Sequence, residues 1–370
     1  MCACVSPPAG QKDVLAALAQ ELNWDTLLEL ADEHGVQGML ARRLEETSYE
    51  GVPGSAREKL QRRVRARHLF SLSLSVELFR ILDDFLKAQV EVICVKGPTV
   101  SQVAYGDPSL RSFGDLDLLV RHRDIQAVYE RMQAMGFEPD IPPLAITAGK
   151  IPGEYVFRRT GTPRMVEFHT EKTFRHYPQP MRIDDMMARK RCVQLDGRGV
   201  PALILEDEVV FDCVHGGKDF WERLVWVADV AAIVARYPEL NWENALQAAK
   251  AVGADRMLLA GVQLAREVLS STIPERIAGA IQTDPQSRAL CAKIRRWLPY
   301  AGYRSPGVVG RAAYRMQMAG GGIAGAAYLA RLSFSSTEDD WEENGGGGKS
   351  WLWETLRRPF RLIRKYGSGE

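Results

Sequence analysis

Two aspartates with a single residue between them are the first candidates for chemistry in this sequence. Asp115 and Asp117 interrupt a run of apolar residues that ends at Val120. Successive side chains of a β-strand point to opposite faces, so both acids would lie on one face, about 6.5 to 7 Å apart at Cα. Carboxylates held that close repel each other unless a cation joins them, and hard oxygen ligands favour Mg²⁺ or Mn²⁺. The spacing therefore predicts a divalent metal site, against the alternative that the pair faces solvent or caps a turn.

A third carboxylate lies on a second stretch with the same alternation. In Val166-Glu167-Phe168-His169, the glutamate and the histidine would share one face of a strand and the apolar side chains the other. Glu167 is therefore the expected third acid of the site. Two roles stay open for His169, which would either orient Glu167 or pair within the sheet.

A glycine turn precedes the acid pair. A short run rich in β-branched residues, 90–95, ends at a Lys-Gly-Pro-Thr turn, and residues 100–105 can form one or two helical turns. Glycine lets the backbone approach a phosphate, and a helix N-terminus favours negative charge, whereas Pro98 removes one backbone N–H from such a cradle. Together with the acids, the turn predicts a site for a metal-bound polyphosphate. The candidate anion-binding residues are Lys96, which would equally suit an exposed strand end, Gly97, Thr99, Arg111 and Ser112.

The elements that must position these residues alternate between strand and helix. The patterns predict strands over 90–95 and 115–120, a helix over 124–136, and a hairpin of residues 154–159 and 164–169. Helical periodicity dominates the chain before this part and returns from about Asp184 onward. The order of elements therefore predicts an α/β (α+β) module between helical segments.

Changes in the pattern divide the chain into four parts. We expect an N-terminal helical region over residues 1–88, an α/β core over 89–180 and a helical domain over 181–275. The last part, 276–370, would hold further helices, an acidic and glycine-rich linker at 337–348, and a basic tail.

The composition excludes several classes of protein. The 48 basic and 47 acidic residues leave a formal net charge of +1, which is not the electrostatic footprint of a nucleic-acid coat. Six scattered cysteines fit neither a zinc knuckle nor a disulfide framework, which predicts reduced thiols. The sequence shows no signal segment at its N-terminus and no apolar run of about 18 residues. We therefore expect a cytoplasmic protein.

The ordered set of motifs resembles a known family. The segments at 96–99, 110–112, 114–120 and 167–169 are similar to the glycine turn and acid pair of the polymerase-β-type nucleotidyltransferase superfamily. More closely, they resemble the bacterial uncharacterised nucleotidyltransferase family, as does a later segment that contains His215, Lys218 and Asp229.

The resemblance implies a nucleotidyltransferase core with a small mixed sheet and two bound Mg²⁺ (or Mn²⁺) ions. It also implies transfer of a nucleoside monophosphate from an NTP, with ATP the expected substrate, and release of pyrophosphate. By position, the residues expected to bind the metals and carry catalysis are Asp115, Asp117 and Glu167. Those expected to bind the nucleotide are Lys96, Gly97, Thr99, Arg111 and Ser112.

Three basic residues are candidates for the surroundings of the site or for contact with the acceptor: His169, His215 and Lys218. The last two flank a Gly-Gly pair between two predicted helices. At such a corner, a role in ending the helix is the alternative.

The predicted function is therefore Mg²⁺-dependent nucleotidyl transfer to an unidentified acceptor hydroxyl, on a small molecule, a peptide, a protein or an RNA. Two alternatives stay open. One is a catalytically degenerate protein that binds a nucleotide or a partner without turnover. The other is a toxin-like nucleotidyltransferase that modifies tRNA, which would need a local basic groove because the chain as a whole is nearly neutral.

The C-terminal tail, residues 351–370, combines five basic and two acidic residues with tryptophans and other apolar side chains. Such a segment suits either an interfacial helix on a membrane or a partner, or packing on the protein itself. Pro359 breaks the helical period and favours packing.

Overall fold

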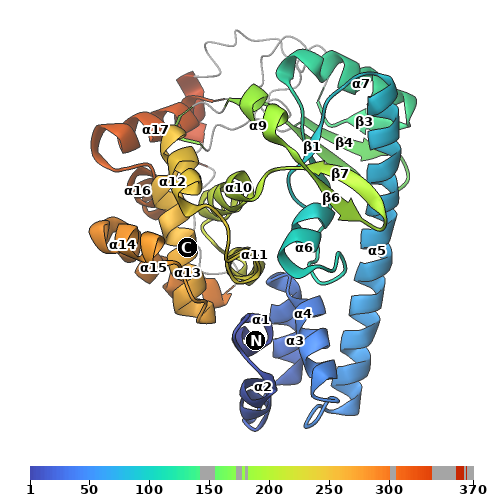
Figure 1. Cartoon of the computed structure of the whole chain (residues 1–370), viewed down its shortest axis with the longest axis vertical. Coiled ribbons are helices and arrows are strands. Elements are labelled where there is room, and N and C mark those ends of the chain that lie inside the picture. The colour runs from blue at the N-terminus through green and yellow to red at the C-terminus, as the bar shows by residue number, and fades with distance from the viewer. Residues whose placement is uncertain are drawn as a thin grey trace.

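A helix of 34 residues, α5 (Gly54–Lys87), runs along one side of the molecule from the N-terminal helices to the sheet (Figure 1). The computed structural model describes residues 1–141, 155–171, 177–179, 182–300, 306–335, 356–361 and 364. The N-terminal helices are α1 (Cys2–Val5), α2 (Gln11–Leu18), α3 (Trp24–Glu33) and α4 (Gln37–Glu46), and the first half of α5 packs on α3 and α4. A helix this long joins two packing regions because its apolar residues continue at helical spacing through both.

A seven-stranded mixed sheet lies against the second half of α5. Its order is β3-β4-β5-β2-β1-β7-β6, with parallel pairing between β2 and β5 and between β1 and β7. The strands are β1 (Ile93–Cys94), β2 (Leu116–Leu119), β3 (Phe137–Pro139), β4 (Tyr155–Arg159), β5 (Met165–His169), β6 (Arg191–Leu195) and β7 (Arg198–Ala202).

The two faces of the sheet bury different sets of side chains. On β2, Leu116 and Leu118 face a cluster that α5 and α7 (Ile125–Ala134) complete, whereas Leu119 belongs to a larger cluster on the opposite side. Because side chains alternate along a strand, Asp117 lies on the same face as Leu119. The acid side of the sheet is thus turned away from α5.

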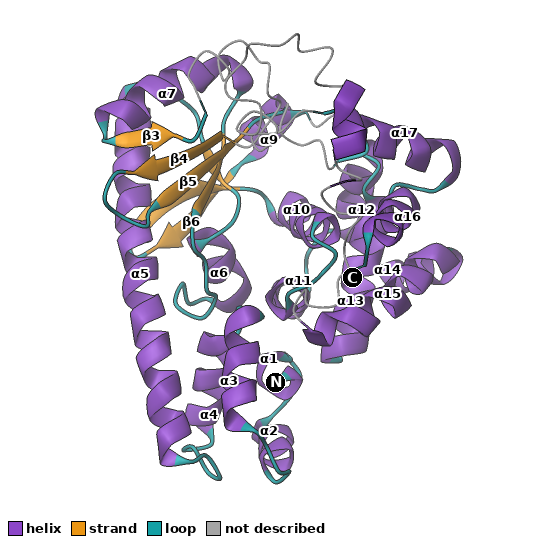
Figure 2. Ribbon diagram, turned by 180° about the vertical axis from the view of Figure 1, so that it is seen from behind, coloured by secondary structure: helices purple, strands orange, loops and turns teal. Residues whose placement is uncertain are grey.

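The remaining helices lie beyond that acid face. Helix α10 (Leu205–Lys218) and helix α11 (Leu224–Arg236) lie between the sheet and an outer group of helices (Figure 2). The outer group is α12 (Trp242–Ala251), α13 (Asp255–Leu269), α14 (Glu275–Thr283), α15 (Pro285–Trp297), α16 (Val308–Met318) and α17 (Gly322–Phe334). Two short helices complete the fold, α6 (Pro98–Tyr105) after β1 and α9 (Ile183–Arg189) before β6.

The predicted fold class is confirmed, and the predicted hairpin is present as β4 and β5. The expectation that helices alone follow Asp184 is wrong for residues 191–202, which form the β6–β7 hairpin. The sheet therefore extends beyond residue 180, the predicted end of the α/β core. These two strands carry few β-branched residues, so their period-2 signal is weak.

Part of the C-terminal tail is described. Arg358 is buried and donates hydrogen bonds to the carbonyl oxygens of Leu332 and Ser333 at the end of α17, at 2.5 and 3.1 Å. This part of the tail packs on the protein. The expected linker at 337–348 lies outside the described residues. Across the described part of the chain, none of the helices is both long enough and apolar enough to traverse a bilayer.

Candidate active site

Two neighbouring parallel strands bring an aspartate, a glutamate and a histidine together. Strands β2 and β5 pair in parallel so that Asp117 lies opposite Glu167 and Leu119 opposite His169. All three polar side chains point to one face, and one ligand atom from each lies within 4.8 Å of the other two. Asp117 and His169 are buried and Glu167 is partly exposed. The sheet register thus builds a three-residue cluster from segments 50 residues apart in the chain.

A single oxygen of Asp117 carries two contacts. Its Oδ1 accepts a hydrogen bond from Lys96 Nζ at 2.5 Å and lies 2.8 Å from His169 Nε2. Burial alone would raise the pKa of Asp117, but Lys96 and His169 outweigh burial and hold the pKa well below its usual range. The Asp117 carboxylate therefore stays ionised at neutral pH. His169 lies 3.9 Å from Glu167 Oε2, so its closer contact is with Asp117.

Asp115 lies beside this cluster and not within it. Strand β2 begins at Leu116, so Asp115 occupies the bend before the strand, where alternation no longer fixes the direction of a side chain. It is partly buried. Burial, and then the charge of Asp117, raises the pKa of Asp115, which shows that the two acids still act on each other.

The glycine turn joins β1 to α6. Gly97 has φ 62° and ψ −127°, a conformation that side chains with a Cβ rarely adopt. Pro98 occupies the first turn of α6, where a backbone N–H has no partner within the helix, so its fixed φ suits the start of the helix. Thr99 is fully buried, and its hydroxyl donates to the carbonyl oxygen of Lys96 at 3.0 Å. The threonine hydroxyl thus holds the turn together.

Arg111 is committed to an internal ion pair. Its Nε donates to Asp229 Oδ2 on α11 at 2.8 Å, and the Tyr105 hydroxyl donates to the other oxygen of Asp229 at 2.8 Å. Arg111 and Asp229 are both buried. The predicted phosphate contact of Arg111 would have to use its remaining guanidinium nitrogens. Ser112, the next residue, is partly buried and makes no hydrogen bond within the described residues.

A polar face of α10 points toward the same region, and sequence reasoning missed two of its members. Glu208, Asp212 and His215 follow one another at steps of four and three residues, which places them on one face of the helix. Burial raises the pKa of Glu208 and of Asp212 well above their usual values, and each acid is further affected by a neighbouring acid. Carboxylate oxygens of both have no hydrogen-bond partner. The sequence signal that could have identified these two acids is their i, i+4 spacing among apolar residues of a predicted helix.

His215 completes that polar face, near the end of α10. Its ring packs edge-on against Trp226 with 5.2 Å between ring centres, and its Nδ1 lies 3.5 Å from Asp219 Oδ2. Burial, and then the positive charge of Lys96, holds the pKa of His215 well below its usual range, so the imidazole is neutral at neutral pH. Lys218, in the last turn of the same helix, is partly exposed. Its charge also lowers the pKa of His215.

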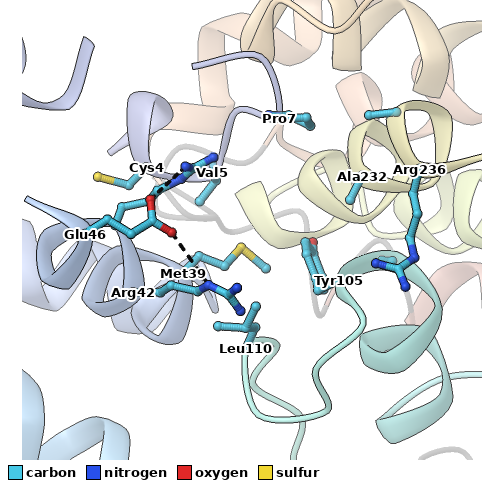
Figure 3. Close-up of a pocket in the computed structure, with 13 residues that line it drawn as sticks. Cys4, Val5, Pro7, Met39, Arg42, Glu46, Tyr105, Leu110, Ala232 and Arg236 are labelled. Carbon is cyan, nitrogen blue, oxygen red and sulfur yellow. Dashed lines mark hydrogen bonds and ion pairs between the residues drawn. The ribbon is translucent and has the colours of Figure 1, made fainter. Parts of the chain in front are cut away.

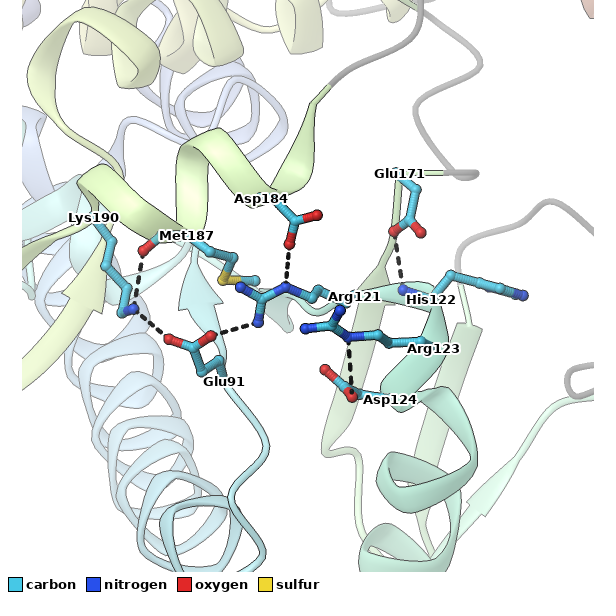
Figure 4. A network of polar contacts seen from close by, with 9 residues as sticks. All are labelled: Glu91, Arg121, His122, Arg123, Asp124, Glu171, Asp184, Met187 and Lys190. Atoms are coloured by element: carbon cyan, nitrogen blue, oxygen red, sulfur yellow. Dashed lines mark hydrogen bonds and ion pairs between the residues drawn. The ribbon is translucent and has the colours of Figure 1, made fainter.

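A polar network fixes the ends of the two strands that carry the cluster (Figure 4). Arg121, just after β2, donates to Glu91 ahead of β1 and to Asp184 on α9, each at 2.5 Å. The backbone N–H of His122 donates to Glu171, just after β5, at 2.9 Å. These bonds hold β2, β5 and the start of β1 in one arrangement.

The donor set fits a hard divalent cation. Asp117 and Glu167 supply carboxylate oxygens from one face of the sheet, the former kept ionised, and His169 supplies a nitrogen. Carboxylate oxygens suit Mg²⁺ and Mn²⁺ better than softer metals. Within the described residues this is the only such group of three potential ligands.

Comparison with known families agrees with the motifs. The family model of the uncharacterised nucleotidyltransferases matches residues 20–270, about two thirds of the chain. The chain belongs to this nucleotidyltransferase family. All the residues of the cluster, the glycine turn and the α10 face lie within the matched segment. The resemblance recognised in the sequence motifs is thus confirmed.

Comparisons with individual proteins say less about this chain than the family model does. No curated protein matches the chain. An antigenic nucleotidyltransferase-like protein from Paracoccidioides brasiliensis is similar to it at 15% sequence identity and a TM-score of 0.33, over 55% of this chain and 93% of that protein.

Proposed function

We propose that this member of the family transfers a nucleoside monophosphate from an NTP, with ATP as the expected substrate, to an acceptor hydroxyl, with Mg²⁺ or Mn²⁺ as cofactor. The observation that carries the proposal is the register of β2 against β5, which sets Asp117 opposite Glu167 beside the glycine turn. In the reaction the acceptor oxygen forms a bond to the α-phosphorus, the bond from that phosphorus to pyrophosphate breaks, and the acceptor proton is released to water.

Asp117 and Glu167 would hold the cation, and Asp115 would join them as the third acid. Bound metal would polarise the phosphoryl oxygens and lower the pKa of the acceptor hydroxyl. Gly97 lets the backbone of the turn come close to the triphosphate, and Lys96, at the entrance of the turn, would neutralise phosphate charge. Arg111 and Asp229 fix the segment ahead of Asp115, and the remaining nitrogens of Arg111 would add to the charge that meets the phosphates.

Nucleotide or partner binding without turnover is the rival function, and one contact favours it. Lys96 already places a positive charge 2.5 Å from Asp117 Oδ1 and so partly takes the role of a metal cation. A protein that had lost catalysis would keep such a pair, because removing one partner would leave the other charge buried and uncompensated. The acceptor, a cytoplasmic location, the four-part division of the chain and any role of His215 and Lys218 toward the acceptor stay predictions of the sequence.

The proposal is tested by incubating the full chain with each α-³²P-labelled NTP, Mg²⁺ or Mn²⁺, and acceptors of each class. Asp117→Asn and Glu167→Gln are expected to lower label transfer about a thousandfold, because losing a metal ligand removes several kcal/mol of charge stabilisation in the transition state. Asp196→Asn is the matched control, since Asp196 is exposed in the turn between β6 and β7.

Three outcomes separate the candidates. Transfer that depends on Asp117 and Glu167 but not on Asp196 supports the proposal. Transfer that survives both site substitutions rules out the assigned acids. Saturable binding of NTP without transfer to any acceptor supports the rival function.

A further inference from the structure

A pocket lies at the other end of α6 from the glycine turn, between the N-terminal helices and α11 (Figure 3). Its volume is about 370 Å³, within the range of small-molecule sites. Helices α1, α4, α6 and α11 each contribute to its wall. None of the groups proposed for nucleotidyl transfer lines it.

The lining is rich in guanidinium groups. Arg42, Arg43 and Arg236 line the pocket, against one acid, Glu46. Arg43 is well paired with Glu46 at 2.9 Å, whereas Arg42 reaches Glu46 only at 3.7 Å and Asp107 at 3.5 Å. Two of the three arginines therefore have weak or no pairing within the pocket.

Arg236 is the arginine left without an acid. It makes no ion pair or hydrogen bond within the described residues, and its guanidinium carbon lies 6.0 Å from the centre of the Tyr237 ring. A Cβ at residue 106 would lie 2.8 Å from Arg236 Nη1, so Gly106, with φ 70°, leaves the space that the guanidinium occupies. The planar fork of an arginine binds phosphate or carboxylate through two parallel hydrogen bonds.

The rest of the wall is apolar. Met39, Leu110 and Ala232 line it, and the ring of Tyr105 faces into it from α6 (Figure 3). The Tyr105 hydroxyl is already bonded to Asp229, so the ring offers an aromatic surface and no free donor. This combination suits a ligand with an apolar body and a charged end.

The pocket is separate from the acid cluster. Tyr105 is seven residues along α6 from Pro98, which at 1.5 Å per residue is about 10 Å. A ligand that contacts Tyr105 and Arg236 would therefore lie at the opposite end of α6 from the turn where the phosphates would be held.

We propose that this pocket binds a small organic anion, with a phosphate or carboxylate group on Arg236 and Arg42 and an apolar body against Tyr105, Met39 and Leu110. The inference does not depend on nucleotidyl transfer, because every residue that carries it lies outside the acid cluster and the glycine turn.

Isothermal titration of the full chain with phenyl phosphate and with benzoate tests the proposal. Wild-type protein is expected to bind at least one of the two probes, and Arg236→Gln to weaken that binding about tenfold or more, because a charge-assisted pair of hydrogen bonds is lost. Phenol, which has the ring without the anion, is expected to bind more weakly than either probe. Arg65→Gln is the matched control, since Arg65 is exposed on α5 and makes no contact with the pocket.

A further variant separates this site from the glycine turn. Binding that persists in Lys96→Gln and is lost in Arg236→Gln supports the proposal. Equal affinity in wild type and Arg236→Gln, loss in Lys96→Gln alone, or no binding of either probe would overturn it. The melting temperature of Arg236→Gln, expected to match wild type because Arg236 is exposed, shows whether its loss of binding comes from unfolding.

Discussion

At the scale of single residues, the central feature of this member of the nucleotidyltransferase family is one carboxylate oxygen that contacts two partners. Asp117 Oδ1 contacts both Lys96 and His169, and Glu167 lies opposite on the neighbouring strand. A divalent cation that binds Asp117 has to compete with the ammonium of Lys96 for the same carboxylate. Under the proposed function, the lysine would therefore affect the electrostatic balance of the metal site as well as bind phosphate.

Lys96→Met is expected to increase the affinity for Mn²⁺ in the absence of nucleotide, by about tenfold, because the substitution removes a competing positive charge at 2.5 Å. Electron paramagnetic resonance of free Mn²⁺ during a titration measures this. Lys59→Met is the control, since it removes a lysine–aspartate pair of similar length, 2.6 Å, at the far end of the chain's long helix. Unchanged or weaker Mn²⁺ binding in Lys96→Met would contradict the assignment of Asp117 as a metal ligand.

The turn itself depends on a single glycine. Gly97→Ala is expected to lower the free energy of unfolding by about 1 to 3 kcal/mol, because φ 62° with ψ −127° is strained for any residue with a Cβ. Gly114→Ala provides the comparison, since Gly114 has no positive φ and open space around its Cα. Urea unfolding of both variants measures the difference. Equal stabilities would show that the turn relaxes without cost.

At the scale of elements, the site forms where the sheet meets α10. The sheet supplies Asp117, Glu167 and His169, and one face of α10 supplies Glu208 and Asp212. On the sheet, the positive charge of Lys96 compensates the negative charge of the Asp117 carboxylate. The α10 pair keeps carboxylate oxygens without hydrogen-bond partners. Buried, unpaired acids destabilise the folded state in their ionised form, so the α10 acids are expected to be protonated in the native protein.

This difference predicts how stability changes with pH. The pKa of Glu208 is raised by burial above its ordinary value, so the native state holds a proton that the unfolded chain has released. The free energy of unfolding therefore falls as pH rises from the unfolded pKa, about 4.3, toward the raised native pKa. The Glu208→Gln variant has no carboxyl group at this position, so its free energy of unfolding does not fall in this way as the pH rises.

The expected result is a melting temperature for Glu208→Gln that exceeds wild type by more at pH 8 than at pH 4. Differential scanning calorimetry across this range measures it, with Glu239→Gln as the control because Glu239 is exposed. The opposite trend, a variant relatively less stable at pH 8, would mean that Glu208 is ionised and paired in the native protein.

The elements also show what the sequence can predict. Alternation placed Glu167 and His169 on one face correctly, because β5 is a regular central strand with an apolar opposite face. The same rule does not extend to Asp115, because this residue precedes strand β2. The β6–β7 hairpin was missed although its turn contains Asp196-Gly197 with positive φ at both residues, a strong local hairpin signal. The helical periodicity of α10 predicts a helix but not which element its polar face approaches, because that depends on tertiary packing.

At the scale of the whole molecule, two hydrophobic clusters share strand β1. On β1 and beside it, Val92 and Cys94 belong to the cluster under α5, whereas Ile93 and Val95 belong to the larger cluster with the C-terminal helices. Arg111, bonded to Asp229 of α11, adds a buried polar link between the loop before β2 and the C-terminal helices. Helices α10 to α17 are called the helical half below. Elements joined through a common strand and a buried ion pair are expected to unfold together.

The cysteines provide a test of this cooperativity, because all six are free and four of them are buried. Cys94 lies in the cluster under α5, and Cys213 and Cys291 lie in the helical cluster. Burial raises the pKa of Cys94 to about 12 and also raises that of Cys213, so these thiols are expected to be unreactive in the native state. Exposed Cys2 and Cys192 are expected to react at once.

Iodoacetamide labelling in increasing urea, read by mass spectrometry, then follows each cluster separately. If the sheet and the helical half are one folding unit, Cys94 and Cys213 become reactive at the same urea concentration, because neither cluster stays closed once β1 separates from its neighbours. Labelling of Cys213 well before Cys94 would show that the helical half opens alone and would support a domain boundary near residue 180. Since β6 and β7 follow that residue, and β7 pairs with β1, we expect the first result.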